Sequence, residues 1–273
     1  MNEKRDFIRS CFICDQHGGH RVGLTPPKYQ SAIRGNKHFR TQVALWDFYE
    51  ETIESIQPID FLASNGDGID GRGERSGGSE LLTNNRHTQC DMTSESILLT
   101  KAKVIALTRG TPYHVGQLEE FEDIIAKNVN AIKIEDHAWY DINGVIFDVK
   151  HQPGGTSGVP HTSGTAITMD HLWNIIWNDH NLEQPRADVT LRAHTHSFSF
   201  HGNDIWLGIY QPALQGMGSK FGAKQCRKLV HFGIIWFDIF NEPKNGVKYI
   251  WDWKIAQIVE HKAKALDVSS YLS

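Results

Sequence analysis

The sequence has no excess of positive charge and no long apolar run. Its 28 Lys and Arg residues are outnumbered by 32 Asp and Glu, which gives a net charge of −4 and a pI near 6.4. This balance provides no basic field that would hold a long polyanion non-specifically, although local basic patches remain compatible with it. No apolar run approaches membrane-spanning length, and the charged N-terminus (residues 1–6) leads into a short apolar stretch without a cleavage-site pattern. We therefore expect no signal peptide and no membrane partner.

Cysteine is also scarce, with four residues in the chain. Cys11 and Cys14 form a C-x-x-C, a spacing found in redox and zinc sites. They lie inside the apolar run 7–14, where alternate residues of a strand face opposite sides of a sheet, and Cys90 and Cys226 make no second pair. We interpret them as reduced thiols of a cytoplasmic protein.

Length and composition are those of an ordinary globular protein that can bury a full core. Apolar runs and amphipathic stretches alternate, without an internal repeat or a linker, so we expect one α/β domain with mixed sheets over residues 1–273. The runs that predict strands are residues 7–14, 59–63, 103–108, 145–150, 189–193 and 205–210. A hairpin is expected over about residues 229–256.

Helices are predicted where apolar residues recur every three or four positions. The expected helices cover residues 36–56 with Asn36 as N-cap, 84–101, a stretch marked by Val115, Leu118, Phe121 and Ile124, and a stretch from Met169 that ends before Pro185. Trp173 and Trp177 lie on the last of these and are interpreted as core residues, with stacking on a base as the alternative. Asn143-Gly144 predicts a hairpin turn before 145–150, whose partner is 131–134 unless that run pairs elsewhere.

Side chains that bind metals fall in five clusters, each of which follows an apolar run. They are Asp15-Gln16-His17, Gly66-Asp67-Gly68-Ile69-Asp70, Gly110-Thr111-Pro112-Tyr113-His114, His151 and Ala193-His194-Thr195-His196. Carboxylates and imidazoles that several strands deliver to one edge of a sheet are what two adjacent divalent metals need. Two such metals commonly hydrolyse phosphate esters.

Each cluster alone is a weak signal. Asp15 and His17 would point to the same side of an extended strand end, and Gly66 would let the backbone turn sharply before Asp67. Two imidazoles at i and i+2 after a strand are more specific, because each can hold a metal, and neutral imidazole suits Mn, Fe, Zn and Ni.

Taken together and in this order, the clusters resemble the calcineurin-like metallophosphoesterase superfamily, over roughly residues 7–210. The pattern of that superfamily is D-x-H, G-D-x-x-D, G-N-H, a lone His and G-H-x-H. The resemblance implies two mixed β-sheets packed as a sandwich and flanked by helices, in four layers α/β/β/α. It also implies two divalent metal ions (Mn, Fe, Zn or Ni, with Mn favoured) and a bridging hydroxide that attacks phosphorus.

The resemblance further implies which residues bind the metals and how they share them. The first metal would be held by Asp15, His17, Asp67 and His196. The second would be held by Asp67, His151 and His194, with the Asp67 carboxylate as the bridge. A shared carboxylate offsets the repulsion between two dications at close range.

The third cluster departs from the pattern, because the Asn that would bind the second metal is missing. Thr111 or a water would fill its place, and the second metal would then bind less tightly. His114, two residues late, is our candidate for the general acid that protonates the leaving alkoxide. The resemblance pairs it with Asp70, whose carboxylate would favour the imidazolium form. The alternative is a structural histidine at a helix start.

Other residues compete for roles near these clusters. His20 and His161 lie in nearby glycine-rich loops and are alternatives to His151 as a ligand. Arg72, Arg75 and Arg109 would either clamp phosphate oxygens or remain solvated loop charges.

The function predicted from these residues is a metal-dependent phosphoesterase. A phosphodiester or nucleotide substrate is favoured, because Gly71 stands where phosphoprotein phosphatases of the superfamily have an arginine. A DNA-processing nuclease is an alternative, although the acidic balance opposes it. A phosphoesterase-like binding scaffold is another, with the missing Asn as its only support. An unrelated metallohydrolase such as an amidohydrolase would carry its H-x-H early in the chain.

The expected partner is a small phosphate ester or nucleotide, a nucleic acid is the alternative, and the oligomeric state stays open.

Overall fold

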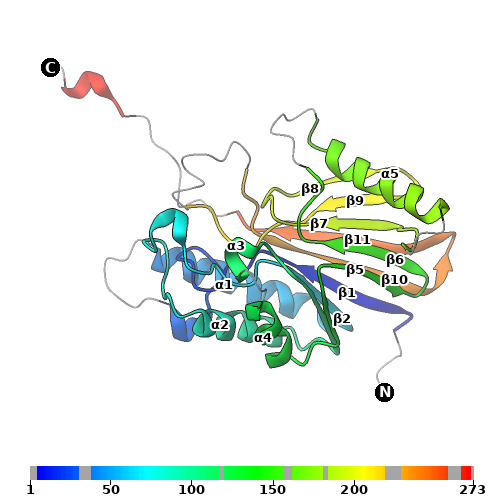
Figure 1. Cartoon of the computed structure of the whole chain (residues 1–273), viewed down its shortest axis with the longest axis horizontal. Coiled ribbons are helices and arrows are strands. Elements are labelled where there is room, and N and C mark those ends of the chain that lie inside the picture. Colours follow the sequence, from blue (N-terminus) through cyan, green and yellow to red (C-terminus); the bar gives the residue numbers. More distant parts are fainter. Residues whose placement is uncertain are drawn as a thin grey trace.

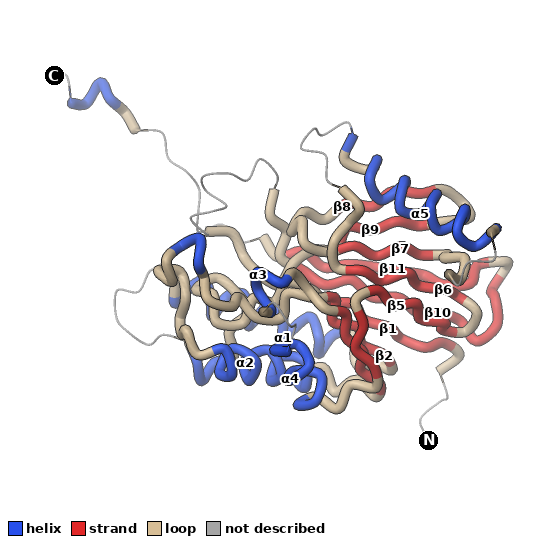
Figure 2. The backbone as a smooth tube through the Cα atoms, viewed as in Figure 1, coloured by secondary structure: helices blue, strands red, loops and turns tan. Residues whose placement is uncertain are grey.

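A computed structural model of the chain describes residues 5–30, 38–116, 120–155, 162–180, 184–218, 229–257 and 266–271. These residues form two mixed β-sheets that pack face to face, as Figures 1 and 2 show. Helices α1, α2 and α4 lie on the outer side of the first sheet and α5 covers the second. The predicted fold class, a sandwich of two mixed sheets flanked by helices, is confirmed. Among the described residues, no helix is long and apolar enough to cross a membrane.

The first sheet has six strands in the order β11-β10-β1-β2-β3-β4, and the second has five in the order β5-β6-β7-β9-β8. The strands of the first sheet are β1 (Phe7–Ile13), β2 (Phe61–Asn65), β3 (Val104–Thr108), β4 (Lys133–Glu135), β10 (Gly233–Lys244) and β11 (Val247–Ile255). Those of the second are β5 (His137–Ile142), β6 (Val145–Lys150), β7 (Val189–Arg192), β8 (Ser199–Gly202) and β9 (Leu207–Tyr210). The α-helices are α1 (Phe39–Ser55), α2 (Arg86–Leu99), α3 (Pro112–Val115), α4 (Glu120–Asn128) and α5 (Thr165–Asp179). Single 3₁₀ turns lie at Pro27–Tyr29, Glu74–Ser76 and Val268–Tyr271.

Three apolar clusters separate the four layers, and the alternation of side chains along β1 shows how. Cys11 and Ile13 pack against the helices, whereas Phe12 between them faces the second sheet. The Phe12 ring stacks on Phe147 with 5.1 Å between centroids and meets Phe237 edge-on at 5.6 Å. Because both faces of the first sheet are covered, its central strands are apolar on both sides.

Strand direction gathers the five polar clusters at one end of the sandwich. In the first sheet β1, β2 and β3 run parallel, and in the second β6, β7 and β9 do. The carboxyl ends of parallel strands meet at one edge of a sheet, and ligand sites form in the crevice outside it. The five clusters follow the carboxyl ends of β1, β2, β3, β6 and β7.

The second sheet begins with a hairpin whose turn the sequence predicts. Asn143 and Gly144, with φ of 51° and 75°, connect β5 to β6. The run 131–134 does not pair with β6. It leads into β4, which pairs with β3 in the first sheet, so this run pairs elsewhere, as the sequence allowed. The short edge strand β8 was not predicted.

Several predicted helices differ in their details. The single helix expected around Val115 is two described helices, α3 and α4, and Gly116 with φ of 101° ends the first of them. Asn36, Leu118, His161 and Cys226 lie outside the described residues.

The interpretation of Trp173 and Trp177 as core residues is wrong, since they are 55% and 43% exposed. The face of α5 toward the sheet is instead made by residues such as Ile167 and Asn174. The apolar periodicity correctly predicts a helix here, but it does not predict which side of the helix is buried.

A buried arginine fastens α5 to the second sheet. Arg192, at the end of β7, is 1% exposed and contacts both oxygens of Asp148 on β6 at 2.9 and 3.0 Å. Its Nε donates to Asp170 of α5 at 2.7 Å. Burial alone would raise the pKa of Asp148, but the charge of Arg192 and the hydrogen bond from His137 hold that pKa below its ordinary value. Arg192 therefore compensates two carboxylates just before the strand delivers His194.

Replacing Arg192 by Met should lower the free energy of unfolding by about 3–5 kcal/mol, because Asp148 would remain buried without its main partner. Chemical denaturation at neutral pH measures the change. Arg40→Met, on the exposed side of α1, is the matched control and should stay within about 0.5 kcal/mol of the wild type. Equal stability of the Arg192 variant and the wild type would contradict this role of the buried pair.

Candidate metal centre

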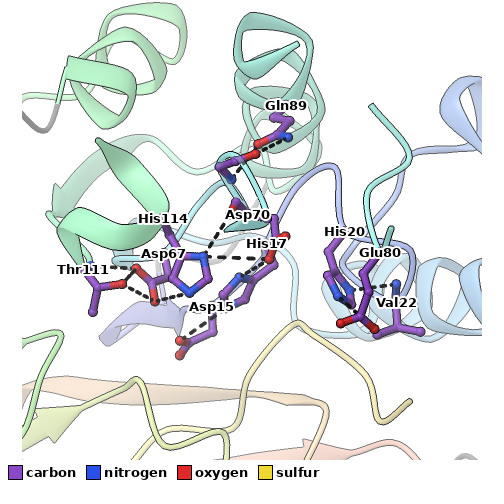
Figure 3. A network of polar contacts seen from close by, with 12 residues as sticks. Asp15, His17, His20, Val22, Asp67, Asp70, Glu80, Gln89, Thr111 and His114 are labelled. Atoms are coloured by element: carbon purple, nitrogen blue, oxygen red, sulfur yellow. Dashed lines mark hydrogen bonds and ion pairs between the residues drawn. The ribbon is translucent and has the colours of Figure 1, made fainter. Parts of the chain in front are cut away.

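The structure brings all six predicted metal ligands to the carboxyl-terminal edge of the sheets. They form two groups, Asp15–His17–His196 and Asp67–His151–His194, and within each group one ligand atom per residue lies within 4.8 Å of the others. The groups adjoin, since His151 Nε2 is 3.1 Å from Asp67 Oδ2 and 3.9 Å from Asp15 Oδ1. Asp67 thus belongs geometrically to the second group and approaches the first through His151. Figure 3 shows Asp15, His17, Asp67, Asp70, Thr111 and His114 gathered at this place.

The backbone at these ligands is unusual. Nine non-glycine residues among those described have a left-handed φ, and five of the nine are predicted ligands: Asp15, His17, Asp67, His194 and His196, with φ from 45° to 65°. A residue with a Cβ loses about 1–2 kcal/mol in this region, where Gly or Asn would fit more easily. If these positions served only to form turns, Gly or Asn would suit them better than Asp or His. Backbone strain of this kind clusters at functional sites.

In the first group, nitrogen and oxygen lone pairs converge on one point. Asp70 Oδ1 lies 3.1 Å from Nδ1 of His17, and as an ionised carboxylate it accepts the proton of that nitrogen. The Nε2 of a neutral His17 is then bare, and it lies 3.3 Å from His196 Nε2. His196 Nε2 is in turn 3.1 Å from Asp15 Oδ1. Burial raises the pKa of Asp15, but His196 and His151 lower it below its ordinary value.

In the second group, a buried histidine nitrogen faces a carboxylate. His151 Nδ1 donates to the backbone oxygen of Asn65 at 2.7 Å, so Nε2 of the neutral ring carries a lone pair. That Nε2 makes no hydrogen bond within the described chain, although Asp67 Oδ2 lies 3.1 Å away. Despite burial, Asp67 and Asp15 raise the pKa of His151 to about 10. Two acceptors at this distance need a proton or a metal cation between them, and the donor set of oxygens and imidazoles suits divalent metals.

Thr111, where the superfamily pattern has Asn, contacts the carboxylate of Asp67. Its backbone N and its Oγ1 donate to Asp67 Oδ1 at 2.7 and 2.9 Å. The other oxygen, Oδ2, faces His151, and His194 Nδ1 lies 3.9 Å from it. Thr111 Oγ1 also lies 3.1 Å from Oδ2, so Thr111 orients the whole Asp67 carboxylate while Oδ2 faces the histidines.

His114 and Asp70 are close, but their pairing differs from the expected one. His114 Nδ1 donates to the backbone oxygen of Asp70 at 3.0 Å, whereas the Asp70 carboxylate is 3.8 Å away and accepts from His17 instead. Burial and the neighbouring His17 lower the pKa of His114, while Asp67 and Asp70 oppose them. Because Nδ1 is engaged, Nε2 faces the centre, 4.0 Å from Asp67 Oδ2.

The competing residues lie differently. His20 is buried outside both groups, accepts from the backbone N of Val22 through Nδ1, and has its pKa lowered by burial to about 4. Arg109 binds Asp123 at 2.7 Å and Asp136 at 3.3 Å. His161 and the side chain of Arg75 lie outside the described residues.

Glu122 is a buried carboxylate of the centre that sequence reasoning missed. It lies on α4, is 2% exposed, and its Oε1 and Oε2 accept from the backbone N of Gly68 at 3.0 Å and of Gly110 at 2.6 Å. Burial and the charge of Asp67 raise its pKa to about 7. Glu122 thereby joins the turn after Asp67 to the turn before Thr111. No local signal distinguishes it from its acidic neighbours on the helix, and only the fold places it here.

Comparisons with known proteins give distant structural similarity. No family model matches the chain, and no curated protein does. Among solved structures, Vps29 of Entamoeba histolytica complexed with Zn²⁺ shares 12% identity over 91% of this chain and 99% of its own, with a TM-score of 0.45. A structure described as a novel archaeal phosphodiesterase shares 12% identity over 91% and 100%, also at 0.45. A predicted phosphoesterase of Streptococcus pneumoniae shares 10% over 93% and 100%, at 0.35. Similarity at this level does not bear on the activity of this chain.

Replacing Glu122 by Gln should weaken metal binding, because the amide keeps one acceptor for two backbone N–H donors and the turns that carry Asp67 and Thr111 loosen. Loss of a hydrogen bond that orients a metal-binding residue commonly costs about 10–100-fold in metal affinity. Calorimetric titration of Mn²⁺ into metal-free protein measures the change. Glu51→Gln, exposed on α1, is the control. A Glu122 variant that melts like the wild type and binds Mn²⁺ equally well would refute the positioning role.

Proposed function

We propose that the protein is a metal-dependent phosphoesterase of the calcineurin-like metallophosphoesterase superfamily. The observation that carries the proposal is the pair of adjoining Asp/His groups at the ends of parallel strands, in which the buried His151 Nε2 makes no hydrogen bond within the described chain. Two divalent ions held there supply a hydroxide nucleophile at neutral pH and positive charge for the phosphoryl oxygens. Asp15, His17 and His196 hold one ion and Asp67, His151 and His194 hold the other.

The residues of the chain provide orientation and proton transfer. Asp67 lies beside both groups, and Thr111 orients its carboxylate so that Oδ2 faces His151. Asp70 orients His17 through its carboxylate and His114 through its backbone oxygen. His114 then protonates the leaving oxygen from Nε2, the nitrogen that faces the centre.

The substrate that we propose is a small phosphodiester or nucleotide. Gly71 leaves the position after Asp70 without the arginine that phosphoprotein phosphatases of the superfamily carry. The net charge of −4 gives no support to a nuclease that grips long DNA. A binding scaffold would explain the missing Asn ligand, but the assembled ligands and the orientation of His114 favour catalysis.

With Mn²⁺ added, the purified protein should hydrolyse p-nitrophenyl phosphate or its bis ester, and the ratio of the two rates separates monoesterase from diesterase. Asp67→Asn should remove both bound metal, measured by elemental analysis, and turnover, because its carboxylate adjoins both groups. Asp47→Asn, exposed on α1, should change neither. Full metal content without turnover of any ester would favour the scaffold.

Replacing His114 by Asn should lower kcat by roughly 10²–10⁴-fold, the usual loss when a general acid is removed, while metal content stays normal. Steady-state kinetics on an ester with a poor leaving group measures the loss best, because such a group needs its proton most. Wild-type turnover in this variant would exclude His114 as the acid.

A further inference from the structure

A cavity opens on the flank of His114. Its volume is about 510 Å³, and its lining includes Arg72, Arg86, Tyr113 and His114. A neighbouring hollow of about 640 Å³ shares Arg72 with it. His114 thus lies between the metal-binding groups, toward which its Nε2 points, and a space large enough for a small organic group.

Two guanidinium groups in this cavity, those of Arg72 and Arg86, contact no carboxylate of the described residues. Arg86 Cζ lies 3.9 Å from the centroid of the Phe121 ring, a cation–π contact that holds the guanidinium beside the cavity. Gly116, with φ of 101°, lies beside the guanidinium and also lines the cavity. Neither Arg72 nor Arg86 forms an ion pair or hydrogen bond with a carboxylate within the described chain. Their N–H groups are therefore available to a ligand.

The remaining lining limits what that ligand is. Glu74 and Glu120 also border the cavity and balance the charge of the two arginines. A long polyanion is disfavoured by these carboxylates, whereas a single anionic group can be bound by the forked guanidinium donors. The ring of Tyr113, edge-on to His114 at 4.8 Å between centroids, adds a flat surface for an organic ring.

We propose that this cavity is the leaving-group subsite and that it takes an alcohol carrying a second anionic group, a phosphate or a carboxylate. The inference rests on the proposed function, in which His114 is the general acid. A general acid lies beside the leaving oxygen, and His114 borders the cavity, so the leaving group would extend into the cavity. Arg72 and Arg86 bind the second anion, and Tyr113 contacts the organic part between the two charged groups. The subsite selects esters whose leaving alcohol carries its own phosphate or carboxylate over esters whose leaving alcohol is neutral.

The test uses three aryl phosphates whose phenols have matched acidity, with a neutral, a carboxylate or a phosphonate substituent on the ring. For the Mn²⁺-loaded wild type, kcat/KM should be about tenfold or more higher for a charged ring than for the neutral one, as expected for a charge-assisted hydrogen bond. Arg72→Gln and Arg86→Gln should each reduce this preference about tenfold, whereas Arg40→Gln on α1 should keep it. The carboxylate and phosphonate arms show which anion is preferred.

An equal rate for all three rings in the wild type, or an undiminished preference in the arginine variants, would overturn the subsite. Arg86→Lys keeps the charge and serves if Arg86→Gln does not fold. If the metal-loaded wild type turns over no aryl phosphate, the proposed function fails, and the subsite is then tested by calorimetry with the phosphonate-bearing phenol. Binding to the wild type that the Arg72→Gln, Arg86→Gln double variant loses would support the subsite, and no binding to the wild type would refute it.

Discussion

The structure depends on how the fold tolerates buried carboxylates at the meeting of two sheets. Asp15 and Asp67 are almost wholly buried, and burial by itself disfavours their charged forms. Four imidazoles from three strand ends surround them and reverse that preference. Neutral imidazole nitrogens and carboxylate oxygens are both hydrogen-bond acceptors where they face each other. The compensating positive charge therefore has to be a proton or a cation bound between them. A cation bound here would therefore also stabilise this end of the sandwich.

The backbone at this end is arranged for chemistry at the expense of stability. Asp15, His17, Asp67, His194 and His196 all adopt a conformation that glycine would adopt more easily. Surrounding contacts hold them there: the backbone N of His17 donates to the backbone oxygen of Asp67, and the backbone N of His194 donates to Asp15 Oδ2. Ligands of one strand end thus fix the turn of another, and the two sheets are joined where the candidate metals would lie.

Local patterns in the sequence predicted the parts of this arrangement that local physics controls. Buried strands end at polar residues, and parallel strands deliver those residues to one edge, which predicts that the clusters meet, whereas the assignment of each ligand rested on the resemblance to the superfamily pattern. Contacts across the fold were out of reach. Nothing near Glu122 indicates that its helix lies behind two glycine turns, and the apolar period of α5 does not tell that Trp173 faces solvent. The Asp70 carboxylate accepts from His17 rather than His114 because the turn at Gly71 brings the backbone oxygen of Asp70 closer to His114.

The altered third cluster shows how a changed motif keeps its geometry. Thr111 precedes α3 with φ of −78° and ψ of 137°, and Pro112, which lacks an N–H, occupies the first helical turn, where no partner is needed. One turn of helix then absorbs the two residues by which His114 is late and returns its ring to the Asp70 backbone oxygen. The amide ligand is lost, but the same turn lets the backbone N and hydroxyl of Thr111 bind Asp67 Oδ1. The same short turn therefore places both the Thr111 contacts to Asp67 and the His114 hydrogen bond to the Asp70 backbone oxygen.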